Sequence, residues 1–160
     1  MPIDPPPYDQ QKPQKDCVEI SEQSIYSVAP LFFRHKTEGY FDPEDQMSAD
    51  ILAIRTELGL PEFLQERRYP PIHTWGIECP NAWFEIVLDA VTKIEALLND
   101  MVKTGINVDD LPACSQIKEK FGGLRLYWRA SDAAPFTQAM REVIAQAEAR
   151  VLSLQRRVPC

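Results

Sequence analysis

Residues 116–128, QIKEKFGGLRLYW, decide the fold. Apolar residues alternate with polar ones on both sides of Gly122-Gly123. A Gly-Gly pair suits the left-handed backbone that a two-residue hairpin turn requires. The stretch therefore predicts a β-hairpin over residues 116–129. A loop of Gly122 and Gly123 predicts three facing pairs: Phe121 with Leu124, Glu119 with Leu126, and Ile117 with Trp128.

One face of this hairpin should be the core face. The six paired residues share it, because side chains alternate along a strand. Glu119 is the one carboxylate among them, and a buried charge is costly unless it is paired. We therefore interpret Glu119 as a structural residue held by a cation or a backbone N–H, with ligand binding or catalysis as the alternative. The opposite face is basic and carries Gln116, Lys118, Lys120, Arg125, Tyr127 and Arg129.

The basic face has two interpretations. It is a solvated strand face, on which cations discourage edge-to-edge pairing, or it binds an external anion such as nucleic acid. In the predicted register Lys120 lies opposite Arg125, so we expect an acidic partner from elsewhere in the chain. A hairpin alone is marginally stable, and we expect residues 17–20 or another segment to extend the sheet.

Two long helices are predicted from apolar periodicity. Apolar residues recur every three or four positions between Trp83 and Val102, after Pro80 and before Gly105, which predicts a core helix over about residues 80–104. A similar stripe predicts a second helix over about 135–156. The expected fold is α+β, a small antiparallel sheet with a central hairpin packed against these helices. Glu78 precedes the first helix, where it caps free N–H groups or takes part in an interaction.

Composition sets the domain organisation. A chain of 160 residues is one domain by length. Prolines at positions 2, 5, 6, 7 and 13 predict an extended arm over residues 1–16, which leaves 17–160 as a single α+β domain. Residues 17–36 contain a strand-like start and an apolar run that suits helix or strand.

Charge and cysteine content narrow the classes of function. The net charge is −7, yet residues 116–160 hold eight basic and four acidic residues, so the acidity lies in residues 1–115. Such a surface repels nucleic acid and attracts a basic protein. The four cysteines lie far apart and there are two histidines, which predicts no metal site and no cofactor. Without a leader or an 18-residue apolar run, we expect a cytoplasmic protein with reduced thiols and no membrane partner.

An acidic segment lies between the hairpin and the arm. Residues 37–50 hold five acids around two aromatic residues, and a short helix should follow, capped by Asp42 or Ser48 and ended by Gly59. The segment is a solvated loop or a protein-binding edge. The candidate partner-binding residues are Glu38, Tyr40, Phe41, Asp42, Glu44 and Asp45.

Two stretches together resemble a known family. They are WGIECPNAWFEIV (residues 75–87) and QIKEKFGGLRLYW (116–128). The family comprises small bacterial and phage-borne proteins with Gly-Phe-Glu-Cys-Gly-x-Gly-Trp before a helix and then Lys-Glu-Lys-Phe-Gly-Gly-Leu-Arg-Phe-Tyr. The resemblance covers about residues 75–155. This chain has Pro80-Asn81-Ala82 in place of Gly-x-Gly, and one C-terminal cysteine, Cys160, in place of Cys-x-x-Cys-Gly.

The resemblance implies a scaffold and a class of function. Some members lie beside genes of polymorphic or secreted toxins and look like immunity proteins. The shared structural motif residues are Glu78, Trp83, Glu119, Phe121, Gly122, Gly123 and Arg125. We therefore expect an immunity protein that binds and occludes a cognate, basic toxin acting in the cytosol, and not an enzyme.

Two other functions stay open. The first is a nucleic-acid-associated phage or mobile-element protein that uses the basic hairpin face, although the acidic residues 1–115 make nucleic acid an unfavoured partner. The second is an enzyme in which Glu78, Glu119 and His73 converge. A catalytic histidine needs a positioned partner, and the sequence identifies none for His73.

Overall fold

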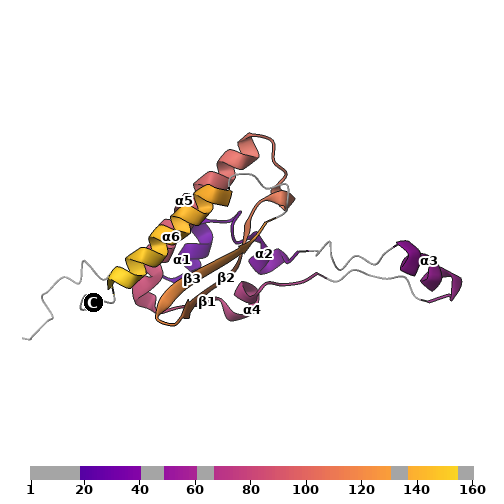
Figure 1. The fold of residues 1–160 in the computed structure, drawn as a ribbon, viewed down its shortest axis with the longest axis horizontal. Coiled ribbons are helices and arrows are strands. Elements are labelled where there is room, and N and C mark those ends of the chain that lie inside the picture. Colours follow the sequence, from indigo (N-terminus) through magenta and orange to yellow (C-terminus); the bar gives the residue numbers. More distant parts are fainter. Residues whose placement is uncertain (1–18, 41–48, 61–66, 131–136, 155–160) are drawn as a thin grey trace, which may run out of the picture.

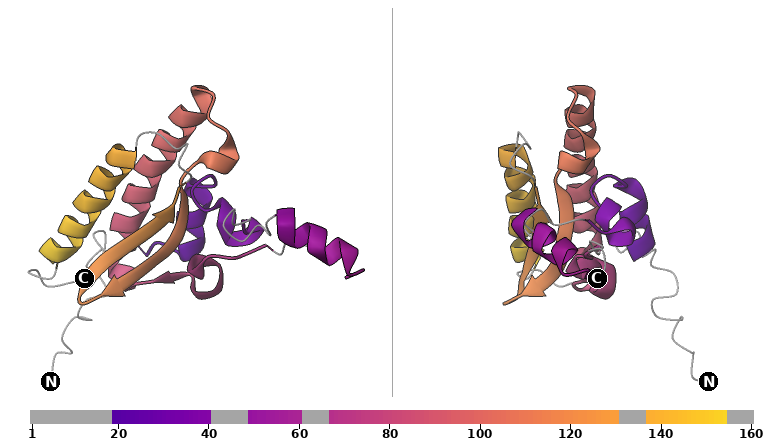
Figure 2. Two further views of the ribbon diagram at one scale, coloured as in Figure 1. Left: turned by 45° about the vertical axis from the view of Figure 1, so that its right-hand side comes forward. Right: turned by 90° about the vertical axis from the view of Figure 1, so that its right-hand side faces the viewer.

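A single long helix, α5 (Phe84–Lys103), occupies the centre of the fold. The computed structural model of the chain describes residues 19–40, 49–60, 67–130 and 137–154. Helix α6 (Thr137–Leu154) packs along one side of α5 and against the sheet, and α1 (Glu22–Val28) packs against another side of α5 (Figures 1 and 2). The two predicted long helices are confirmed, and together with the sheet they confirm the α+β class.

The apolar stripe of α5 explains its central place. Val87, Val91, Ile94 and Leu98 are fully buried, at spacings of three and four residues. The 3₁₀ turn η2 (Asn81–Trp83) precedes α5, and Gly105 follows its end. The predicted cap at Glu78 is wrong, because this residue lies on strand β1 (Ile77–Glu78) and no side chain caps η2.

The sheet has three strands in the order β1-β2-β3. Strands β2 (Ala113–Lys120) and β3 (Gly123–Arg129) form the predicted hairpin. Strand β1 pairs with β2 in parallel, Ile77 with Ile117 and Glu78 with Lys118, so the sheet is mixed rather than antiparallel. The expectation that residues 17–20 or another segment would extend the sheet is confirmed by β1, which is another segment. Residues 19 and 20 form no strand, and 17 and 18 lie outside the described residues.

The hairpin turns one residue earlier than predicted. Phe121 and Gly122 have φ values of 53° and 76°, and Lys120 pairs with Gly123, as a two-residue type I′ turn requires. Both central residues of the turn have positive φ, and Gly122 adopts this conformation without steric cost. The register of the hairpin is thus shifted by two from the predicted one, and Lys118 rather than Lys120 lies opposite Arg125.

A shift of two preserves the faces of both strands. Ile117, Leu124 and Leu126 are buried against the helices as predicted. Of the other three residues predicted on the core face, Trp128 is half-buried and two are exposed. Phe121 is 92% exposed at the turn, and Glu119 is exposed near the end of β2. The core face therefore ends before the turn is reached.

The N-terminal segment joins the core through a buried carboxylate. Residues 19–40 form α1 and α2 (Arg34–Glu38), which resolves the helix-or-strand ambiguity in favour of helices. Glu95 of α5, 6% exposed, accepts hydrogen bonds from the backbone N–H groups of Leu31 (2.8 Å) and Phe32 (3.0 Å). The Phe32 carbonyl in turn accepts from Cys114 N on β2 at 2.7 Å. This chain of bonds ties α5, the α1–α2 linker and the sheet together.

Three shorter elements complete the described chain. Helix α3 (Ala49–Glu57) lies between α2 and α4 (Pro71–Trp75), and the 3₁₀ turn η3 (Val108–Asp110) connects α5 to β2. Among the described residues, no helix has both the length and the apolar content needed to cross a membrane. The predicted arm over residues 1–16 lies outside the described residues.

Candidate functional site

The segment that carries α3 leaves and re-enters the domain at one point. Tyr40 and Arg68 form an isolated antiparallel bridge, in which each backbone N–H donates to the other's carbonyl at 2.9 Å. Helix α3 lies between these two residues in the sequence, and it stands apart from the rest of the described molecule (Figure 1). A long loop closed at its base on a rigid scaffold is a common carrier of binding residues.

Tyr40 is anchored to the sheet at the base of this loop. The Arg129 guanidinium donates a hydrogen bond to the Tyr40 hydroxyl, and its central carbon lies 3.9 Å from the centroid of the tyrosine ring. His35 lies on the same ring at a centroid separation of 5.4 Å. Tyr40, half-buried, is therefore held in place by contacts within the domain.

His35 is uncharged at neutral pH. Burial, followed by the guanidinium groups of Arg34 and Arg129, lowers its pKa to about 4. A histidine so placed accepts no proton in the range in which histidine switches usually act.

Helix α3 exposes its large apolar side chains. Ile51 and Ile54 of α3, and Leu58 directly after its last residue, are 49%, 55% and 69% exposed, and their spacing of three and four residues places them on one face. None of the residues of α3 is buried. Two further exposed residues, Leu52 and Leu60, adjoin this face. Clustered exposed apolar side chains mark sites of interaction with other molecules.

The predicted partner-binding residues fall into two groups. Glu38, exposed at the end of α2, and Tyr40 lie at the base of the loop. The other four lie outside the described residues: Phe41, Asp42, Glu44 and Asp45. The predicted helix after them is present as α3, and the predicted end at Gly59 is confirmed by its φ of 67° and by hydrogen bonds of the Gly59 and Leu60 N–H groups back to α3.

A second feature is an open groove beside the hairpin turn. It has a volume of about 620 Å³. Its walls come from the stretch between β1 and α5 and from the turn end of β2. The lining residues are Ile77, Glu78, Cys79, Pro80, Trp83, Glu119 and Gly122. Four of the seven motif residues of the resemblance thus line one groove, whereas sequence reasoning treated the two stretches separately.

Glu78, Cys79 and Glu119 all line this groove. Strand pairing places the Glu78 side chain on the face of Lys118 and the Glu119 side chain on the opposite face of the sheet. Glu119 accepts a hydrogen bond from the turn N–H of Gly122 at 2.7 Å, the kind of backbone contact that its structural interpretation predicted, although the residue is exposed. Glu78 accepts a long hydrogen bond from Gln116 Nε2 at 3.4 Å. Burial and the nearby Glu22 carboxylate raise the pKa of Cys79 to about 12, so this thiol is protonated and a poor nucleophile at neutral pH.

His73 does not join the two carboxylates. Its Nδ1 atom contacts the Lys36 carbonyl oxygen, and its ring lies 4.2 Å from that of Tyr69. His73 is absent from the groove lining. The three residues of the enzyme hypothesis therefore do not converge: Glu78 and Glu119 both line the groove, but their side chains lie on opposite faces of the sheet.

The basic face of the hairpin is present, but the pairing of its cations differs from the predicted one. Lys118 and Arg125 lie opposite each other, and Glu78 is the cross-strand neighbour of Lys118 on β1. Within the described part of the chain, no carboxylate is within ion-pair distance of either cation. Arg125 instead donates to the Leu124 carbonyl at 3.0 Å. The acidic neighbour that we expected is thus adjacent, without a formed ion pair.

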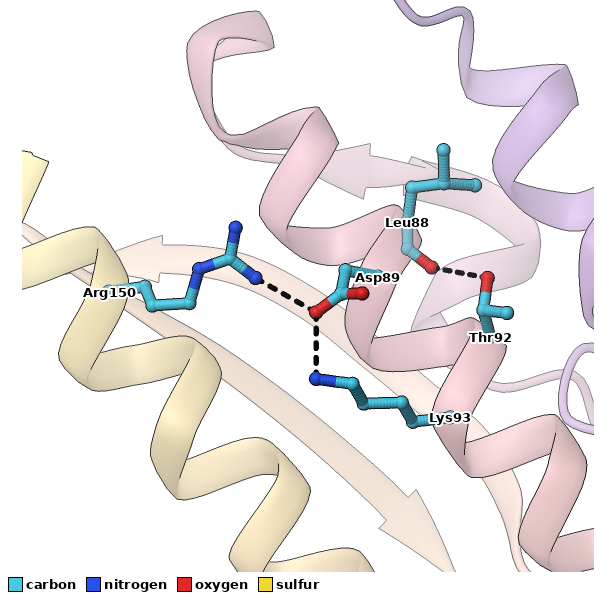
Figure 3. Close-up of polar contacts among 5 residues, drawn as sticks. All are labelled: Leu88, Asp89, Thr92, Lys93 and Arg150. Atoms are coloured by element: carbon cyan, nitrogen blue, oxygen red, sulfur yellow. Dashed lines mark hydrogen bonds and ion pairs between the residues drawn. The ribbon is translucent and has the colours of Figure 1, made fainter.

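A surface ion-pair cluster links the two long helices. Asp89 of α5 accepts from Arg150 of α6 at 2.8 Å and from Lys93 at 3.0 Å (Figure 3). The hydrogen bond and charge of Lys93, and then Arg150, lower the pKa of Asp89. Figure 3 also shows the Thr92 hydroxyl donating to the Leu88 carbonyl, at 2.7 Å.

Three structural polar residues were missed by sequence reasoning. Glu95 interrupts the apolar stripe of α5, a signal that could have marked it. Arg34 donates to the carbonyls of Leu31 (2.9 Å) and Pro112 (3.0 Å). Glu22 accepts a hydrogen bond from the Ile77 N–H at 2.6 Å. No local sequence pattern predicts the long-range contacts of Arg34 and Glu22.

Comparison of the sequence with protein-family models found no match, and neither did comparison with curated proteins or with solved structures. The family resemblance of the two motifs stays a prediction.

Proposed function

We propose that the protein is an immunity protein that binds and occludes a basic toxin acting in the cytoplasm. The observation that carries the proposal is the loop between Tyr40 and Arg68, which is closed at its base and presents α3 with no buried residue. The domain supplies the scaffold, and the loop supplies the binding surface. The resemblance of the two scaffold motifs to immunity-like proteins supports the same function.

The charge of the loop supports a basic partner. Residues 38–60 hold six acidic residues and one basic residue, Arg55. Opposite charge accelerates association and discriminates against acidic partners. A toxin that acts on nucleic acid or on a nucleotide carries a basic active site. Carboxylates of this loop would take the places of the substrate's phosphates and block access to that site.

Helix α3 supplies the apolar part of the contact. An exposed helix binds a groove through apolar residues spaced like Ile51, Ile54 and Leu58. The acidic residues steer the approach, and the apolar stripe slows dissociation, because burial of apolar area provides most of the free energy of binding. Tyr40, already fixed by Arg129, costs little further conformational entropy on binding.

The test is affinity capture followed by a comparison of variants. The full chain as bait should retain one basic protein from host lysate after nuclease treatment and a high-salt wash. Reversal of Asp42, Glu44 and Asp45 to lysine should slow association with that protein at least about tenfold at low salt. The matched control reverses three exposed acids of the helices, Glu85, Asp100 and Glu142.

Two results would count against the proposal. Equal association rates for the loop and control variants would remove the loop from the interface. Capture of nucleic acid alone, released as salt is raised, would favour the basic hairpin face, on which Lys118 and Arg125 have no ion-pair partner among the described residues. In that case log affinity should fall linearly with log salt concentration.

A further inference from the structure

The basic face of the hairpin holds cations beside one another near the turn. Lys118 and Arg125 are direct cross-strand neighbours, and Lys120 lies two positions nearer the turn on the same face. Like charges that face each other across two strands are unfavourable. Within the described residues, no carboxylate lies within ion-pair distance of these three side chains. The fold therefore retains an arrangement of charges that costs stability and forms no ion pair in the described part of the chain.

The acidic residues near this face do not neutralise it. Residues 116–130 hold four basic residues and one acidic residue, Glu119. The side chain of Glu119 lies on the opposite face of the sheet, where it accepts a backbone N–H of the turn. Glu78 lies on the basic face beside Lys118, and its carboxylate accepts a hydrogen bond from Gln116. The basic face thus keeps a net positive charge.

An exposed tyrosine lies among these cations. Tyr127 follows Arg125 by two positions on β3, so both side chains point away from the core that buries Leu124 and Leu126. Tyr127 is 40% exposed, and its cross-strand neighbour is the uncharged Gln116. A sheet face that combines cations for phosphates with an aromatic ring for a base is typical of proteins that bind single-stranded nucleic acid.

We infer that the basic face of the hairpin binds a single strand of nucleic acid. Its phosphates contact Lys118, Lys120 and Arg125. One of its bases stacks on Tyr127. These residues extend over about 13 Å of strand length, so the site takes a short segment of a nucleic-acid strand. This site goes beyond the proposed function, which rests on the loop that carries α3.

Much of the acidity of the chain lies away from this site. The sequence disfavoured nucleic acid because acidic residues outnumber basic ones in residues 1–115. Helix α3, which carries Asp50 and Glu57, lies at the opposite end of the molecule from the hairpin turn (Figure 1). Salt screens repulsion between exposed charges that lie far apart. The charges on the basic face itself therefore dominate its interaction with a phosphate backbone.

The test is fluorescence anisotropy of labelled oligothymidine and oligouridine with the full chain. The protein should bind with a Kd of about 10–100 µM at low salt. Three phosphate contacts predict that log affinity falls with log salt concentration with a slope of about −2. Binding of either oligonucleotide supports the inference, and a difference between them identifies the preferred sugar.

Variants separate base stacking from charge. Tyr127→Leu should weaken binding about tenfold at an unchanged salt slope, and Tyr127→Phe should bind like wild type. Lys118→Gln with Arg125→Gln should weaken binding and flatten the slope by about 1.4, without lowering Tm, because the two facing cations repel each other. The matched control is Lys103→Gln with Arg141→Gln, which removes two exposed cations of α5 and α6 and should change neither affinity nor slope.

Four results would overturn the inference. The first is an unchanged anisotropy with both oligonucleotides. The second is wild-type affinity in Tyr127→Leu, and the third is an equal loss in the control variant. The fourth is co-sedimentation of the chain with vesicles of anionic phospholipid when neither oligonucleotide binds, which would assign the face to a membrane surface. Ile54→Asp with Leu58→Asp should bind the oligonucleotides like wild type, so this test and that of the proposed function can fail separately.

Discussion

Removal of the buried carboxylate of Glu95 should cost a large part of the stability of the fold. Its two oxygens accept the N–H groups of Leu31 and Phe32, which belong to a linker distant in sequence. In Glu95→Ala both donors lose their acceptor, and each unsatisfied buried donor costs about 1–3 kcal/mol. The variant also no longer buries a charge, which offsets part of this loss. We expect a net decrease of about 2–4 kcal/mol in the free energy of unfolding.

Glu95→Gln tests the charge separately from the shape. Glutamine keeps one acceptor oxygen and turns an NH₂ group toward the second donor, so we expect a smaller decrease, about 1–2 kcal/mol. The control is Asp100→Ala, an exposed residue on the same helix, which should change stability by less than about 0.5 kcal/mol. Urea denaturation followed by circular dichroism gives the three values.

The pH dependence provides a second check on the same residue. Burial raises the pKa of Glu95, although the two backbone donors and Arg34 oppose the shift. An acid with a raised folded-state pKa stabilises the fold fully below its unfolded pKa, about 4.3. That contribution is lost as the pH rises through the folded-state pKa. The advantage of wild type over Glu95→Gln should therefore shrink between pH 4 and neutrality.

Two outcomes would refute this reasoning. A Glu95→Ala protein as stable as the Asp100→Ala control would show that the linker does not depend on the carboxylate. Unchanged hydrogen exchange at the Leu31 and Phe32 amides would show that Glu95 does not hold them. Either result would remove the contact that we assign as the main link between the N-terminal segment and α5.

Three further predictions concern other contacts. Gly76→Ala should cost more than about 2 kcal/mol, because its Cβ would overlap the Glu22 carboxylate at a φ of 64°, whereas Gly105→Ala, with φ of 96° and open space around it, should cost less in the same urea titration. Asp89→Asn should cost about 0.5 kcal/mol at low salt and less at high salt, because its ion pairs are exposed. His35, whose pKa is lowered to about 4, stabilises the fold above its unfolded pKa of about 6.5, so urea midpoints should fall between pH 6.5 and 4 and fall less in His35→Gln.

Local patterns in the sequence were sufficient for the long elements. The stripes of α5 and α6 extend over many turns, and Gly122 marks the hairpin, so both helices and the hairpin were predicted correctly. The register was not, because a shift of two residues leaves the same side chains on each face. Only the backbone preferences of the turn residues distinguish the two registers. Because phenylalanine is unusual in a turn with positive φ, the sequence favoured the Gly122-Gly123 turn instead.

The groove and the buried network could not be predicted because they depend on contacts between distant segments. Strand β1 has two residues, too few for a period of two to be recognised, and its parallel pairing is what brings Glu78 beside the end of β2. Glu95 was visible as an interruption in an apolar stripe, yet its partners are 63 and 64 positions away. A carboxylate within an apolar stripe indicates that it has a hydrogen-bonding or charged partner, but it does not identify that partner.

The most direct test of the proposed function is growth rescue in cells that express the captured basic partner as a toxin. Wild-type protein, co-expressed, should restore growth, and Ile54→Asp with Leu58→Asp should not, although it should unfold at the same urea concentration because α3 contributes no buried residue. A control with Thr92→Asp and Ala145→Asp, exposed on α5 and α6, should rescue. Full rescue by the α3 variant, or no toxicity of the captured partner, would contradict the proposal.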